Sequence, residues 1–185
     1  MDADDALEGG EELVLAMPRR ELFSVSGFVT QVEMRVIESL ADESWYAAPS
    51  TLRDDLDAKE VRLGMLIQKD EEALVDADGV LLHATSIPPE TVNLGEGLRG
   101  VRELARIVCK ELLGDHLRGV QLLGYFNDDG FPETRPFFLL VYLIRVDPEA
   151  TSPAGMSWVQ RGGLMELPLD PASTVVAGSW LQAKS

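Results

Sequence analysis

Residues 95–130 read GEGLRGVRELARIVCKELLGDHLRGVQLLGYFNDDG. Between residues 97 and 113, apolar side chains recur every three or four positions, which predicts an amphipathic helix with one core-facing stripe. The stripe consists of Val101, Leu104, Ala105, Val108 and Leu112. Gly114 is placed to end the helix, and residues 120–126 then predict a strand that runs into the turn residues 127–130. The polar face of this helix is the first candidate for a chemical site.

The flanking sequence predicts further strands and two more helices. The strands cover residues 12–16, 61–68, 73–76 and 136–146, and the helices cover residues 30–41 and 173–182. Residues 42–60, with Trp45 and Tyr46 as core anchors, and residues 147–161, with Trp158, are expected to be irregular. Strands before and after a central helix indicate an α+β (mixed α/β) fold. We expect one domain over residues 11–185, preceded by an acidic flexible tail over residues 1–10.

Composition narrows the classes of partner. The net charge is −16, from 32 acidic and 16 basic residues, whereas nucleic acid and anionic membranes are bound by clustered Lys and Arg. Residues 136–144 form the longest apolar run, far below the roughly 18 residues of a membrane span. The single cysteine, Cys109, excludes an intrachain disulfide, and the start of the chain lacks a secretory signal pattern. We therefore expect a cytoplasmic protein that binds neither nucleic acid nor membrane.

Four segments in this order resemble the Nudix (MutT-like) superfamily, in its branch of predicted phosphoesterases. They are residues 13–23, residues 55–59 before the strand over 61–68, residues 123–129 (LGYFNDD), and residues 138–146. The likeness extends over residues 11–183. It implies a Nudix-like mixed β-sheet packed between α-helices.

The family's catalytic helix is degenerate here. Nudix hydrolases carry an Arg-Glu pair and, two residues later, a Glu-Glu pair, whose glutamates hold Mg²⁺ or Mn²⁺. Arg106 and Glu111 match this pattern, but Ile107 and Lys110 replace two of the expected carboxylates. Mg²⁺ requires oxygen ligands, and an ammonium within about 4 Å of it would cost several kcal/mol. We therefore expect no metal and no cofactor.

Three interpretations of the helix face stay open. It could be a solvated surface with intrahelical ion pairs such as Glu103 with Arg106. It could be an anion pocket in which a phosphate meets one or more cations, or a residual metal site at Glu111 with Glu90 or Glu103. The ligand-binding candidates are Arg99, Arg102, Arg106, Lys110 and Glu90.

Other polar residues favour structural roles. Asn127-Asp128-Asp129-Gly130 has turn composition, so a turn is favoured over a metal site. His83 and His116 lack ligand spacing. Cys109 lies within the predicted helix, where a buried structural thiol is favoured over a nucleophile.

The leading hypothesis is therefore a catalytically degenerate Nudix-like domain that serves as a binding or regulatory module. Its partner would be a protein, or a nucleotide-like ligand in the former active-site cleft. One alternative is a Mg²⁺-dependent hydrolase of a nucleoside diphosphate derivative, with substitute carboxylates from Glu90, Glu103, Glu111 or Asp128 and Asp129. Another is a structural subunit of a larger complex, and a homodimer also stays open.

Overall fold

The computed structural model describes residues 11–22, 24–89 and 98–182. These residues form a nine-stranded mixed sheet whose longer path runs β2-β7-β8-β4-β1-β3. Its strands are β1 (Val14–Pro18), β2 (Gly27–Val29), β3 (Trp45–Ala47), β4 (Ala58–Lys69), β5 (Glu72–Asp76), β6 (Leu82–Ser86), β7 (Leu117–Asn127), β8 (Phe137–Val146) and β9 (Met156–Gln160). The mixed α+β fold expected from the sequence is confirmed.

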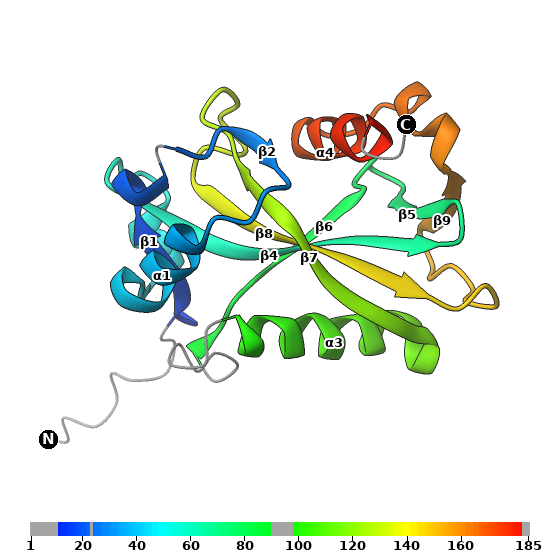
Figure 1. Ribbon diagram of the computed structural model, residues 1–185, viewed down its shortest axis with the longest axis horizontal. Coiled ribbons are helices and arrows are strands. Elements are labelled where there is room, and N and C mark those ends of the chain that lie inside the picture. Colours follow the sequence, from blue (N-terminus) through cyan, green and yellow to red (C-terminus); the bar gives the residue numbers. More distant parts are fainter. Residues whose placement is uncertain (1–10, 23, 90–97, 183–185) are drawn as a thin grey trace, which may run out of the picture.

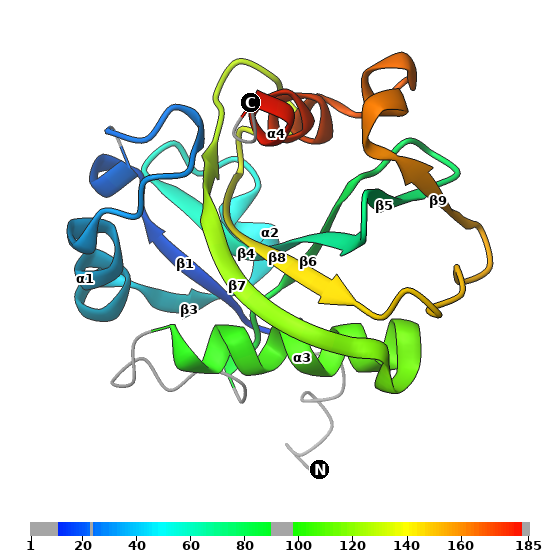
Figure 2. The same cartoon turned by 45° about the vertical axis from the view of Figure 1, so that its right-hand side comes forward.

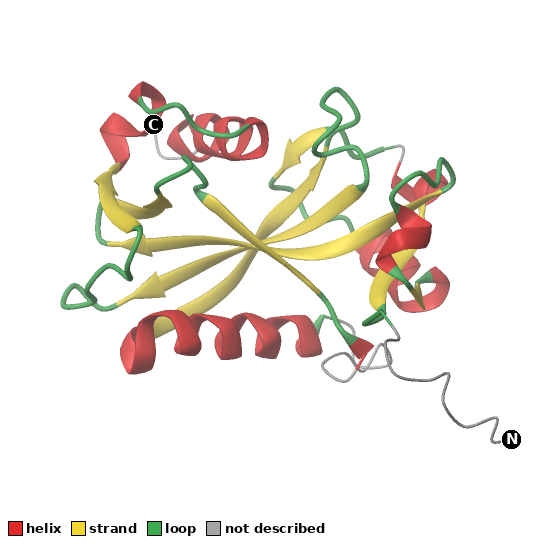
Figure 3. Ribbon diagram, turned by 180° about the vertical axis from the view of Figure 1, so that it is seen from behind, coloured by secondary structure: helices red, strands yellow, loops and turns green. Residues whose placement is uncertain are grey.

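The helices lie on both faces of this sheet, as the views from front and back show (Figures 1 and 3). The α-helices are α1 (Met34–Glu43), α2 (Pro49–Leu52), α3 (Arg99–Leu113) and α4 (Pro171–Gln182). Short 3₁₀ segments are η1 (Arg19–Leu22), η4 (Gly114–His116) and η5 (Arg161–Glu166). In Figure 1, α3 runs along one face of the sheet and α4 lies against the other.

The centre of the sheet is the parallel pair β4 and β8, which aligns Val61 with Phe138 and Ile67 with Ile144. Seven consecutive residues of β8, from Phe138 to Ile144, are buried. A strand covered on both faces needs apolar side chains on both faces. The continuous apolar run therefore marks the strand between the two helical layers.

The two larger apolar cores of the described residues lie one on each face of the sheet. The α3 side holds the larger core, with Tyr125, Phe138 and Tyr142 among its buried residues. The α4 side holds the second core, which includes Phe126, Leu139 and Trp180. Figure 2 shows α1 and β3 beyond β1 at one end of the sheet and the β5–β9 pair at the other.

The main helix ends as predicted, but its buried stripe is shifted. Gly114 follows α3 with a φ of 67°, a value that glycine adopts at little cost. Val101, Leu104 and Ala105 are buried as expected. Cys109 and Leu113 complete the buried stripe, whereas Val108 and Leu112 are only partly buried. Residues four apart share a helix face, so Cys109 and Leu113 continue the row from Ala105.

Two loop predictions were wrong. Residues 42–60 contain β3 and α2. Trp45 lies 40% exposed on β3, whereas Tyr46 packs against the core as expected. Within residues 147–161, β9 pairs with β5 along its whole length and aligns Trp158 with Leu74. Short strands whose partner lies far away in sequence give little local signal, because the pairing itself stabilises them.

Candidate functional site

The outer face of α3 carries every charged residue that the resemblance singled out within the helix. Arg99, Arg102, Glu103, Lys110 and Glu111 are exposed there, and Arg106 is half-buried. Arg106 Nε lies 3.5 Å from Glu103 Oε1, so the expected intrahelical pair is present. Lys110 Nζ lies 3.0 Å from Asp115 Oδ1, at the start of the following connection.

This face does not fit a Mg²⁺ site of the kind that the resemblance implies. Ile107 occupies the surface with 51% of its side chain exposed, and Lys110 precedes Glu111. Among residues 11–22, 24–89 and 98–182, no three His, Cys, Asp or Glu side chains converge as a metal site requires. Glu90, the other carboxylate considered for this role, lies outside the described residues.

A cavity of about 500 Å³ reaches α3 at Leu104. Its polar rim includes Glu11 and Glu12, together with Ser86. The carboxylate of Glu11 accepts hydrogen bonds from the backbone nitrogen of Ser50 at 3.0 Å and from its hydroxyl at 2.5 Å. Carboxylates at this rim make it a poor place for a phosphate.

The histidines and the cysteine occupy structural positions. Nε2 of His83 donates to the carbonyl oxygen of Leu74 at 3.1 Å, and burial lowers the pKa of His83. Nδ1 of His116 lies 3.8 Å from Asp147 Oδ2. Cys109 is fully buried, and burial raises the pKa of its thiol to about 11. A thiol with that pKa is a poor nucleophile at neutral pH.

A buried charged cluster joins the start of β4 to the turn after β7. The side chain of Lys59 is fully buried, and its Nζ lies 2.5 Å from Asn127 Oδ1 and 2.8 Å from Asp129 Oδ1. Arg19 Nη1 also contacts Asp129 Oδ1, at 2.6 Å. Sequence reasoning identified the turn but missed the cluster. The sequence did offer one signal: three of the four segments that resemble the Nudix superfamily each contribute a polar residue to this cluster.

The contacts within this cluster oppose the effects of burial on the pKa values of Lys59 and Asp129. Burial lowers the pKa of Lys59, and the hydrogen bond that Lys59 donates to Asp129 opposes that effect. Burial acts to raise the pKa of Asp129, but the hydrogen bond and charge of Lys59 and the charge of Arg19 outweigh it and hold that pKa below its ordinary value. Asn127 completes the network by donating to the carbonyl oxygen of Val25 at 2.7 Å. The cluster therefore fixes the turn against β4.

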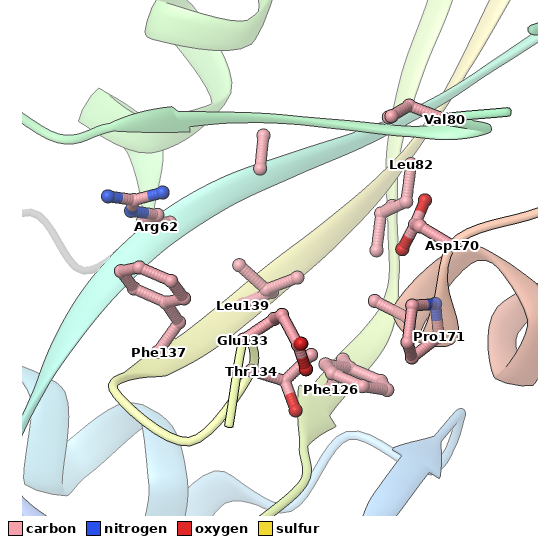
Figure 4. A pocket seen from close by; sticks show the side chains of 12 residues that line it. Arg62, Val80, Leu82, Phe126, Glu133, Thr134, Phe137, Leu139, Asp170 and Pro171 are labelled. Atoms are coloured by element: carbon pink, nitrogen blue, oxygen red, sulfur yellow. The ribbon is translucent and has the colours of Figure 1, made fainter. Parts of the chain in front are cut away.

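An apolar hollow lies on the α4 face of the sheet, opposite α3. It has a volume of about 340 Å³, and its walls come from β4, β6, β7, β8 and the start of α4. Figure 4 shows Arg62 and Phe137 at one end and Asp170 and Pro171 at the other, with Leu139 between them. The apolar wall consists of Val80, Leu82, Ala84, Phe126, Phe137, Leu139, Pro171 and Ala172.

Few polar groups border this cavity, and most are held by the protein itself. Arg62 binds both carboxylate oxygens of Glu60, at 2.8 and 3.0 Å, and its guanidinium carbon lies 3.7 Å from the centre of the Phe137 ring. Asp170 accepts a hydrogen bond from the backbone nitrogen of Ser173 at 3.1 Å and so caps α4. An apolar cavity with a few fixed polar groups is the usual form of a small-molecule site.

The described residues thus form a mixed β-sheet between two layers of helices. The charged helix α3 lies on one face of the sheet, and the apolar cavity lies on the other. Neither the family models nor the curated proteins contain a match to this chain. Among solved structures, Tm1382, a proposed Nudix hydrolase, superposes with a TM-score of 0.79 at 15% identity, over 93% of this chain and 99% of that one. The chain therefore has a Nudix-like fold.

Two smaller Nudix structures overlap with less of the chain. MutT, from a study of Aliivibrio salmonicida and Vibrio cholerae, covers 66% of this chain and 95% of its own, with 13% identity and a TM-score of 0.45. RenU, a Nudix hydrolase from M. smegmatis, covers 66% of this chain and 84% of its own, with 13% identity and a TM-score of 0.41. Separately, no helix within the described residues is long and apolar enough to cross a bilayer.

Proposed function

We propose that this chain is a Nudix-like binding module that does not hydrolyse diphosphates through a metal held on α3. The main support for this proposal is the surface of α3. The positions where the family places glutamates hold Ile107 and Lys110, and Lys110 is paired with Asp115. Glu111 is the one expected glutamate that remains, and it supplies too little negative charge to hold a divalent cation that would neutralise a pyrophosphate.

The ligand that suits the described geometry best is nucleotide-like, with a planar ring in the cavity of about 340 Å³. Phe126, Phe137 and Leu139 supply an apolar surface, and Thr134 and Glu133 supply polar atoms at its edge. Buried apolar area favours ring binding, and a few polar groups fix the orientation. In this proposal the ligand binds on the α4 face, whereas the sequence analysis expected it in a cleft beside α3.

Catalysis is tested by incubating the protein with nucleoside diphosphate sugars, dinucleotides and nucleoside diphosphates in the presence of Mg²⁺ or Mn²⁺. We expect no product above the blank. Turnover that disappears in Glu111→Gln would overturn the proposal in favour of a metal-dependent hydrolase with substitute ligands.

Binding is tested by thermal unfolding with nucleosides and nucleotides. A ligand at about 100 times its Kd adds about 2.7 kcal/mol to the free energy of unfolding. Ala84→Leu places extra methyl groups in the cavity and should abolish the shift, whereas Ala84→Ser keeps the volume and should retain it. No shift with any nucleotide, together with a co-purifying protein, would instead indicate a structural subunit of a complex.

A further inference from the structure

Three arginines line a separate cavity of about 230 Å³ near the buried charged cluster. Arg19 comes from η1, Arg53 directly follows α2, and Arg135 lies in the connection between β7 and β8. The chain has only 16 basic residues against 32 acidic ones. Three of these basic side chains border one hollow together with Asp54 and Asp55, so donors suited to an anionic group are concentrated there.

Arg19 is held in place but incompletely satisfied. Its side chain is 15% exposed, its Nη1 contacts Asp129 Oδ1 at 2.6 Å, and its Nη2 donates to the carbonyl oxygen of Arg135 at 3.2 Å. Its Nε is buried and has no hydrogen-bond acceptor among the described residues. Buried N–H groups are nearly always paired with protein, water or ligand. Arg19 therefore has one N–H group that no described residue accepts.

The other two arginines leave donors available. Arg135 Nε makes a long hydrogen bond, 3.4 Å, to the carbonyl oxygen of Asp129. The side chain of Arg53 is exposed, and no ion pair or hydrogen bond joins it to another described residue. Planar guanidinium groups recognise carboxylate and phosphate oxygens in a bidentate manner. These side chains can therefore supply the donors for an anionic group.

Two carboxylates also line the cavity, and they act differently. Asp55 Oδ1 accepts from the backbone nitrogens of Asp57 at 2.7 Å and Ala58 at 3.2 Å, so it serves the turn before β4. Asp54 is exposed and makes no contact of this kind with the described residues. Asp54 is thus the lining charge that opposes an anion most directly.

We propose that this cavity binds a small organic anion through a phosphate or carboxylate group held by Arg19, Arg53 and Arg135. Leu56, Pro132 and Pro136 form the apolar part of the wall and would contact the ligand's carbon skeleton. The site is distinct from the ring cavity, although Arg53 and Pro136 also line a small hollow of about 120 Å³ that reaches Arg62 and Phe137.

The experiment is calorimetric titration of the full chain with inorganic phosphate, pyrophosphate and citrate at low ionic strength. We expect saturable binding of at least one, and preference for the phosphates or for citrate tells a phosphate ester from a carboxylate ligand. Arg53→Gln and Arg135→Gln should each weaken binding about tenfold, in line with the loss of one charged hydrogen bond. Arg145→Gln is the matched control, because this exposed arginine contacts Gln121 at the other end of β8.

Asp54→Asn tests for an increase in anion affinity, which misfolding of the variant would not produce. Removal of the opposing carboxylate should strengthen anion binding by roughly twofold to fivefold, and added salt should reduce the gain. Absence of binding for all three anions, or equal affinities in Arg53→Gln and Arg145→Gln, would overturn the proposal. Ala84→Leu should leave pyrophosphate binding unchanged, so failure of the ring cavity and failure of this site are distinguishable.

Discussion

Lys59 Nζ lies 2.8 Å from Asp129 Oδ1, and the lysine side chain is fully buried while the aspartate side chain is 54% exposed. The pair joins the start of the central strand β4 to the connection after β7. A buried ammonium is tolerated only when it is paired and hydrogen-bonded. Asn127 and Asp129 together provide that compensation.

The two halves of this pair should differ in their cost of removal. Asp129→Ala leaves a fully buried ammonium with Asn127 as its remaining acceptor, and we expect a loss of about 3 kcal/mol in the free energy of unfolding. Lys59→Met leaves a half-exposed carboxylate that still contacts Arg19, so we expect a smaller loss of about 1–2 kcal/mol. Urea unfolding measures both. Equal losses would show that Asp129 does not compensate the buried charge.

Acid should remove the contribution of Asp129 to the stability of the folded protein. Because its pKa in the folded protein lies below the ordinary value of 3.8, the folded state binds fewer protons at this carboxylate than the unfolded state does. The stabilisation is present above pH 3.8 and disappears as pH falls through the lower pKa of the folded protein. The stability difference between wild type and Asp129→Asn should therefore shrink below pH 3.8. Urea unfolding at a series of pH values tests this, and a constant difference would contradict it.

Gly124 in β7 should not tolerate a side chain. A Cβ at this position would lie 2.1 Å from the carbonyl oxygen of Val29 on the neighbouring strand β2. Gly124→Ala must displace β2, at a cost of about 1–3 kcal/mol. Gly119→Ala in the same strand is the control, since its Cβ would meet nothing within 4 Å. Thermal unfolding compares the two, and equal Tm values would refute the close approach of β2.

Ser173 should be the most sensitive hydroxyl of α4. Its Oγ accepts from the backbone nitrogens of Leu81 at 2.9 Å and Leu82 at 3.0 Å and donates to Asp170. Ser173→Ala leaves two buried N–H groups unpaired, and we expect about 2–3 kcal/mol of destabilisation. Ser179→Ala in the same helix is the control. Similar unfolding free energies for the two variants would show that Ser173 does not hold α4 to the sheet.

Periodicity identified the long elements because each carries its signal locally. The helix at Arg99–Leu113, the buried strand at Phe137–Val146 and the last helix at Pro171–Gln182 all lie close to their predicted positions. The strands at Trp45–Ala47 and Met156–Gln160 were missed because each depends on a partner strand distant in sequence. A pattern of three to five residues is too short to predict such a strand, because the pairing with the distant partner stabilises it.

The residues by themselves determined the fold class, the end of the main helix at Gly114, and the unsuitability of Ile107 and Lys110 as metal ligands, because these depend on local chemistry. Only the tertiary structure brought Lys59 to Asp129, three arginines to one hollow, and Phe126 and Phe137 to another. Such groupings arise where strands distant in sequence become neighbours in the sheet. No local spacing encodes them, because the physical contact exists only after the core has formed.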